Sequence, residues 1–79
     1  MNYTYHEDNI IAEALKEERT VNGYSTAQLA TIIKRSEKDI IDWEDGKFYT
    51  LYPSDLNNLM KLYGYSSLDE WFNKYEAKN

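Results

Sequence analysis

Glycine and proline are rare in this chain of 79 residues, and their positions divide it into short segments. The three glycines are Gly23, Gly46 and Gly64, and the single proline is Pro53. Between them the apolar residues recur at helical spacing, and few stretches alternate with the period of two that a half-buried strand requires. The sequence therefore predicts an all-α fold of helices joined by tight turns.

The first expected helix runs over about residues 9–21. Asp8 is a suitable N-cap for it, because a short acidic side chain can accept hydrogen bonds from the free N–H groups of the first turn. Gly23 can adopt the left-handed conformation that often ends a helix. Residues 1–8 are then expected to form an N-terminal tail.

Four further helices are expected, each with a serine at or near its start. Ser25 with Gln28, and Ser67 with Glu70, have the spacing of a capping box. One domain then covers residues 9–76, with a frayed end at 77–79. The expected caps are Ser25, Ser36 and Ser67, and Ser54 is expected to start the helix that follows Pro53. The breaks that follow the first three of these helices are Lys34-Arg35, Gly46 and Gly64.

Length and composition exclude several classes of function. Nine Lys and Arg against fourteen Asp and Glu give a net charge of −5, the wrong sign for binding nucleic acid by bulk electrostatics. Without cysteine, and with one histidine, the chain has no thiolate chemistry, no zinc cluster of ordinary composition and no Cys-His or Ser-His-Asp arrangement with a likely base. We expect no enzyme activity, no cofactor, no metal and no small-molecule substrate. Because the longest purely apolar run is Ile10-Ile11-Ala12, we also expect no membrane span and a cytoplasmic location.

Residues 25–47 have the pattern of a helix-turn-helix unit, two short helices joined by a turn of a few residues. Ala30 lies where two steeply crossed helices must approach closely, which favours a side chain of one methyl group. The residues expected to close the core around it are Leu29, Ile33, Ile40 and Trp43.

From about Leu15 to Trp71 the chain resembles the Cro/cI-type (XRE) family of helix-turn-helix transcription regulators. The resemblance implies a compact five-helix, lambda-repressor-like domain in a regulator of a bacterial or phage genetic switch. It also implies that double-stranded operator DNA is the partner and that a homodimer binds a palindromic site. The matching stretches are Gly23-Tyr24-Ser25, Gln28-Leu29-Ala30, Ser36, Ile40, Trp43-Glu44-Asp45-Gly46-Lys47, 56–64 and 67–71.

The resemblance also implies roles for individual residues. A structural ion pair is expected between Arg19 and Glu44. In these regulators the second helix of the motif lies in the major groove, where its outward side chains contact base edges. The positions that match base contacts are Thr26, Glu37, Lys38 and Asp42. The basic residues of the motif that are candidates for phosphate contacts are Lys34, Arg35, Lys38 and Lys47.

Two of the expected base contacts are acids, and this leaves a second interpretation open. A carboxylate can accept a hydrogen bond from cytosine, but it is repelled by the phosphates nearby. The alternative is an anti-repressor or modulator, whose acidic third helix binds the basic DNA-binding surface of a repressor. The aromatic residues after Gly46 could belong to that interface or simply cover the core. The candidates for a protein interface are Glu37, Ile41, Asp42, Phe48, Tyr49 and Tyr52.

Overall fold

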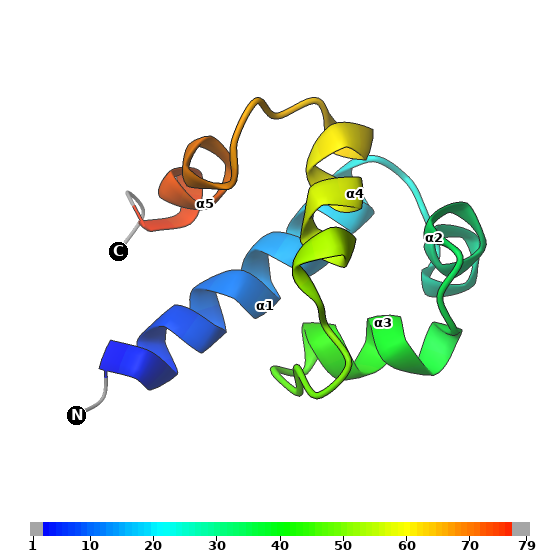
Figure 1. Ribbon diagram of the computed structural model, residues 1–79, viewed down its shortest axis with the longest axis horizontal. Helices are drawn as coiled ribbons and strands as arrows, with labels where there is room; N and C mark the ends of the chain where they lie inside the picture. The colour runs from blue at the N-terminus through cyan, green and yellow to red at the C-terminus, as the bar shows by residue number, and fades with distance from the viewer. Residues whose placement is uncertain (1–2, 77–79) are drawn as a thin grey trace.

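Five α-helices form the described part of the chain, which in this computed structural model comprises residues 3–76 and the side chains of residues 10–75 (Figure 1). No strand occurs within these residues, so the expected all-α, five-helix fold is confirmed. None of the described helices is long and apolar enough to cross a membrane. The helices are α1 (Tyr3–Val21), α2 (Thr26–Ile33), α3 (Glu37–Glu44), α4 (Pro53–Tyr63) and α5 (Leu68–Glu76).

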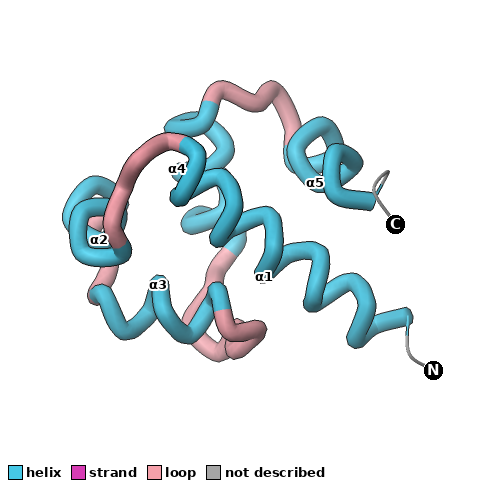
Figure 2. The backbone as a smooth tube through the Cα atoms, turned by 180° about the vertical axis from the view of Figure 1, so that it is seen from behind, coloured by secondary structure: helices cyan, strands magenta, loops and turns pink. Residues whose placement is uncertain are grey.

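The long helix α1 connects the two halves of the molecule. It packs against α3 on one side and against α5 on the other, while α2 packs on α3 and on α4. Figures 1 and 2 show this arrangement from opposite sides, with α2 and α3 grouped at the C-terminal half of α1 and α5 at the end of the molecule away from α2. The helix-turn-helix unit therefore lies at the end of the domain away from α5.

The core draws on all five helices. Trp43 of α3 and Trp71 of α5 are 1% and 0% exposed, so the two largest side chains of the chain are both fully buried. Ala30 is also buried, as expected for the close approach of α2 and α3. The residues expected around it, Leu29, Ile33, Ile40 and Trp43, are all buried.

The predicted caps set the boundaries of α2 and α3. The Ser25 hydroxyl accepts from the Gln28 N–H at 3.0 Å, and the Gln28 side chain accepts from the Ser25 N–H at 2.8 Å. Ser36 and Asp39 form the same reciprocal pair at the start of α3. Because each box satisfies N–H groups that have no partner within the helix, both helices start where the serines predict.

Two helix starts differ from the expectation. α1 begins at Tyr3, so Asp8 lies inside the helix and the expected tail is helical from residue 3 onward. No glycine or proline interrupts residues 3–9, so nothing in the sequence stops the helix at Asp8. α4 begins at Pro53 with Tyr52 as N-cap, because Asp55 accepts from the Tyr52 N–H at 2.9 Å. The expected frayed end at 77–79 lies outside the described residues.

Candidate nucleic-acid interface

A three-residue turn, 34–36, connects α2 to α3. Lys34 adopts a left-handed conformation with φ of 62°, and it is the only non-glycine residue with positive φ in the part of the chain that the structure describes. The next N–H, that of Arg35, donates to the Ala30 carbonyl at 2.9 Å, and Ser36 then starts α3. The turn therefore reverses the chain tightly enough for α3 to pack across α2.

One face of α3 is buried and the opposite face is open to solvent. Ile40 and Trp43 are each 1% exposed, whereas Ile41 is 52% exposed. Glu37 and Lys38 are also exposed at the N-terminal end of the helix. The helix can therefore contact a partner without losing any of its packing on the domain.

The four residues that match base contacts lie at this open face, and they are hydrogen-bonded in two pairs. The Thr26 hydroxyl donates to Glu37 at 2.6 Å, which links the start of α2 to the start of α3. The Lys38 ammonium donates to Asp42 at 2.8 Å. This hydrogen bond and the charge of Asp42 raise the pKa of Lys38. Any partner of this face has to exchange these contacts for its own.

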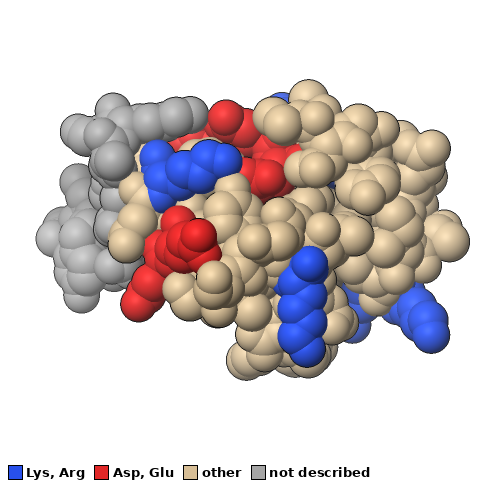
Figure 3. Space-filling view, turned by 90° about the horizontal axis from the view of Figure 1, so that it is seen from above, with Lys and Arg blue, Asp and Glu red and all other residues tan. Residues whose placement is uncertain are grey.

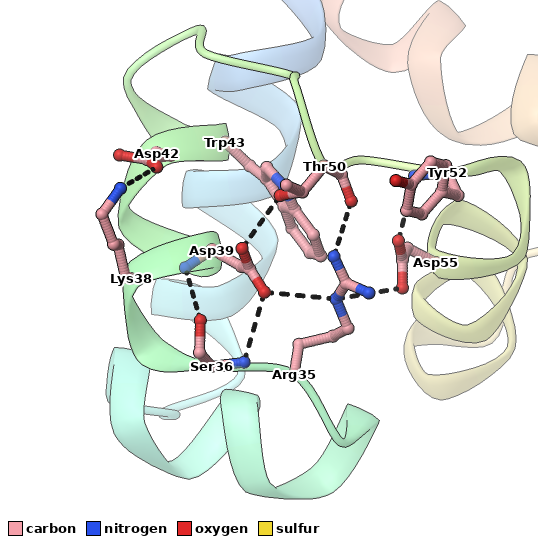
Figure 4. A network of polar contacts seen from close by, with 9 residues as sticks. All are labelled: Arg35, Ser36, Lys38, Asp39, Asp42, Trp43, Thr50, Tyr52 and Asp55. Atoms are coloured by element: carbon pink, nitrogen blue, oxygen red, sulfur yellow. Dashed lines mark hydrogen bonds and ion pairs between the residues drawn. The ribbon is translucent and has the colours of Figure 1, made fainter.

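The side chain of Arg35, in the turn between α2 and α3, is engaged by other residues of the domain (Figure 4). Its guanidinium donates to the Thr50 carbonyl at 2.6 Å, and its Nε lies 3.4 Å from Asp39 and 3.7 Å from Asp55. The side chain is 23% exposed, and two carboxylates already balance its charge. The expectation that Arg35 contacts phosphate therefore does not fit the structure, in which Arg35 joins α3 to the start of α4.

Two aromatic rings and a threonine complete this network. The guanidinium carbon of Arg35 lies 5.4 Å from the ring centre of Trp43 and 5.7 Å from that of Tyr52. The Thr50 hydroxyl accepts from the Trp43 indole at 3.2 Å and donates to Asp39 at 2.9 Å (Figure 4). That bond from Thr50 is the main reason why the pKa of Asp39 lies below its usual value.

The aromatic loop between α3 and α4 is divided between core and surface. Phe48 and Leu51 are partly buried and pack against the core, as the interpretation of this loop as a cover expects. Tyr49 is 86% exposed, and Tyr52 is 54% exposed even though it lies against Arg35. The loop therefore covers the core and also presents two tyrosines to solvent.

The ion pair implied by the family resemblance is present. The Arg19 guanidinium donates to both oxygens of Glu44, at 2.6 and 3.0 Å, and also to the Tyr24 carbonyl at 2.8 Å. The two side chains are 14% and 9% exposed. The hydrogen bonds and charge of Glu44 raise the pKa of Arg19 despite its burial. The pair attaches α3 to α1 and leaves the open face of α3 free.

The surface of the helix-turn-helix motif, residues 25–47, is close to electrically neutral. Arg35, Asp39 and Glu44 are engaged inward, which leaves three lysines and three acids on its surface. Two of these lysines face acids, since Lys47 lies 3.3 Å from Asp45 in addition to the pair of Lys38 with Asp42. The six residues are Lys34, Lys38, Lys47, Glu37, Asp42 and Asp45.

Sequence patterns did not identify Thr50 or Glu18 as organising residues. Thr50 is the one small polar residue in an otherwise aromatic and apolar stretch that runs from Phe48 to Tyr52. That contrast with its neighbours was the only sequence feature that could have indicated its role. Glu18 is 6% exposed and accepts hydrogen bonds from Tyr65, Lys74 and Tyr75. Its local sequence is that of an ordinary solvated helix face, so no signal distinguished it.

The described residues bring together no group of three or more His, Cys, Asp or Glu side chains that could hold a metal ion. The open face of α3 is therefore the candidate site that the structure organises best.

Comparison of the chain with protein-family models, with curated proteins and with solved structures finds no match.

Proposed function

We propose that this protein is a small Cro/cI-type helix-turn-helix transcriptional regulator of a bacterial or phage genetic switch. It acts in the cytoplasm as a homodimer and binds operator DNA with α3 in the major groove. The observation that carries this proposal is the one-sided packing of α3. Ile40 and Trp43 bury one face of the helix, and its other face lies open beside the start of α2.

The roles of the side chains follow from their positions on that face. Thr26, Glu37, Lys38 and Asp42 contact base edges, and the two carboxylates accept hydrogen bonds from cytosine amino groups. Lys34 and Lys47 lie in the turns before and after α3 and contact phosphates.

The test is a gel-shift titration of the DNA upstream of the protein's own gene, over a range of salt concentrations. Lys38→Ala is expected to weaken binding and to reduce the salt slope by about one unit, because one phosphate or base contact is lost. Lys61→Ala, on α4, is the matched control and leaves the slope unchanged. Failure of the unmodified protein to retain any such DNA at low salt would overturn the proposal.

A second function is favoured by the acids and the exposed isoleucine of the same face. Ile41 is 52% exposed, Asp42 follows it in the sequence, and Glu37 and Asp45 lie about one helical turn before and after it. An apolar side chain gains little in a DNA groove beyond contact with a thymine methyl group, but it suits a protein interface. The alternative proposal is a modulator that binds the basic DNA-binding surface of a repressor and releases that repressor from its operator.

Charge reversal distinguishes the two functions. The double substitution Glu37→Lys and Asp42→Lys abolishes the complex with a repressor if the protein is a modulator, because the attraction becomes repulsion. The same substitution strengthens non-specific DNA binding if the protein contacts phosphates directly. Glu13→Lys on α1 controls for the change in net charge, and pull-down and gel-shift measurements on the same preparations record both outcomes.

A further inference from the structure

An open groove lies between α2 and α4. Its volume is about 510 Å³, and no residue of α3 lines it. It lies beside the open face of α3 and shares only Lys34 with the residues proposed to contact DNA, so a segment docked there would compete with phosphate for that lysine. The groove is lined by Ile32, Ile33, Lys34, Asn58, Lys61 and Leu62.

The floor of the groove is apolar. Ile32, the last residue but one of α2, is 45% exposed, and Leu62 of α4, which lines the same groove, is only partly buried. Ile33 is buried and continues the floor into the core. The groove therefore offers the apolar contacts of Ile32, Ile33 and Leu62 to a docked side chain.

The rim of the groove is basic in a protein that is otherwise acidic. Lys34 and Lys61 line it and no acid does, whereas the chain as a whole carries −5. Neither lysine forms an ion pair with any described residue, while Lys38, Lys47 and Lys74 all do. The two positive charges of the groove are therefore available to a ligand.

The distribution of acids over the surface agrees with this. Figure 3 views the molecule from above, with α2 on the right as in Figure 1. Acidic side chains occupy the left and centre of that face, and none is visible on the right, where basic side chains project from the lower edge. An acidic ligand approaching α2 from this side meets no acidic side chain there.

We propose that this groove docks an acidic amphipathic segment of a partner protein. The apolar side chains of the segment pack on Ile32 and Leu62, and its carboxylates pair with Lys34 and Lys61. The Asn58 amide can hydrogen-bond to its backbone. Such a segment has the chemistry of the helical peptides that lay an apolar face into a groove and place charges at its rim.

A second copy of the chain fits the groove less well. Its own acidic and apolar surface lies on α1, where Val21 is 73% exposed near Glu13. Contact between that surface and the groove of another copy would be head to tail, which builds rings or open chains rather than a two-fold symmetric dimer. The favoured occupant is therefore a different protein.

The experiment uses short fluorescein-labelled peptides and the full chain. One peptide combines leucines with aspartates, a second replaces the aspartates by lysines, and a third replaces the leucines by serines. Fluorescence anisotropy is expected to detect binding of the leucine-aspartate peptide alone. Amide chemical-shift changes are expected to centre on the six residues that line the groove.

Substitutions then locate the site. Lys61→Glu and Ile32→Ser are each expected to weaken peptide binding about tenfold or more, since each removes one of the two components of recognition. Lys16→Glu and Val21→Ser replace a lysine and a β-branched apolar residue at exposed positions of α1 and leave the affinity unchanged. All four substituted positions are exposed, so all four variants are expected to fold, and circular dichroism checks this.

Four results would overturn the proposal. Chemical-shift changes could lie outside the groove, or the serine-containing peptide could bind equally well. Concentration-dependent self-association that Lys61→Glu abolishes would identify a second copy as the occupant. A loss of DNA binding in Lys61→Glu as large as that in Lys38→Ala would assign the groove to the DNA interface. Loss of DNA binding by the protein as a whole would overturn only the proposed regulator function.

Discussion

At the scale of single residues, the Arg19–Glu44 pair carries the largest expected effect. Arg19→Ala leaves the Glu44 carboxylate largely buried without its cation and the Tyr24 carbonyl without its donor. Breaking a pair of this kind costs about 3 kcal/mol of unfolding free energy. In a domain of this size that corresponds to a melting temperature lower by roughly 15 °C.

Thermal denaturation followed by circular dichroism measures this change. Arg19→Lys is the informative companion, because it keeps the charge but cannot donate to both carboxylate oxygens at once. Lys16→Ala on the same helix is a control at an exposed position. An unchanged melting temperature in Arg19→Ala would show that the pair does not stabilise the fold.

Lys34 is the second residue with a definite expected effect. Its φ of 62° places a side chain in the left-handed region, which costs about 1 kcal/mol relative to glycine. Lys34→Gly is therefore expected to raise the melting temperature by about 5 °C, and Lys34→Val to lower it. If Lys34→Gly melts below the unmodified protein, contacts of the lysine side chain outweigh the backbone strain.

At the scale of elements, one carboxylate of α1 collects three hydrogen bonds from the α5 side. A single oxygen of Glu18 accepts from Tyr65 at 2.5 Å, from Lys74 at 2.9 Å and from Tyr75 at 3.0 Å. Burial works to raise the pKa of Glu18, but the three hydrogen bonds outweigh it and hold the pKa below its ordinary value. The ionised form of Glu18 therefore stabilises the contact between the two helices.

The stability of this contact is expected to depend on pH at both ends of the range. A lowered pKa means that the stabilisation by Glu18 is complete above pH 4.5 and is lost as the pH falls further. Burial and the hydrogen bond to Glu18 raise the pKa of Tyr65 and of Tyr75, so their contribution is lost as the pH rises above 10.0. The hydrogen bonds to Tyr65 and Glu18 raise the pKa of Lys74, so the stabilisation by Lys74 is also lost at high pH.

The indole resonance of Trp71 in α5 is a suitable probe of this dependence, because Trp71 is fully buried and stacks on Tyr65. Glu18→Gln is expected to lower the stability at neutral pH and to flatten the acid limb of the titration. Glu13→Gln, at an exposed position of α1, leaves both unchanged. An acid limb of the same steepness in Glu18→Gln would assign the transition to other carboxylates.

At the scale of the whole molecule, the net charge of −5 is unevenly distributed. Residues 1–23 carry −3, whereas residues 24–47 and 48–79 carry −1 each. The surface of the motif has as many lysines as acids, Asp39 is paired with Arg35, and the remaining acid, Glu44, is paired with Arg19 of α1. The net charge of the whole chain is therefore a weak argument against binding DNA. The stronger argument is the position of Glu37 and Asp42 on the open face of α3.

The domain is also expected to fold only as a whole. Truncation after Gly64 removes Trp71 and Tyr75, both 0% exposed, and leaves Glu18 without the three donors of the α5 side. A chain of 79 residues has little stability to spare, and each large buried side chain contributes about 1.5–3 kcal/mol. The truncated chain is expected to show no cooperative thermal transition, and a sharp transition would identify residues 1–64 as an independent unit.

Helix positions and buried faces could be predicted because they depend on short-range physics. The capping boxes of Ser25 and Ser36 act over three residues, and the spacing of Ile40 and Trp43 reports the buried face of α3 within one turn. The start of α1 was predicted wrongly, because Asp8 is compatible both with a cap and with a helix interior. The family resemblance was needed to pair Arg19 with Glu44.

The roles of the polar side chains depended on contacts between distant parts of the chain. Arg35 was a plausible phosphate contact until the fold placed Thr50 and Asp55 against its guanidinium. Glu18 meets Tyr65 and Tyr75 across 47 and 57 residues of sequence. A local pattern reports helical periodicity, but the partner of a buried charge is chosen only when packing excludes water and brings the donors together.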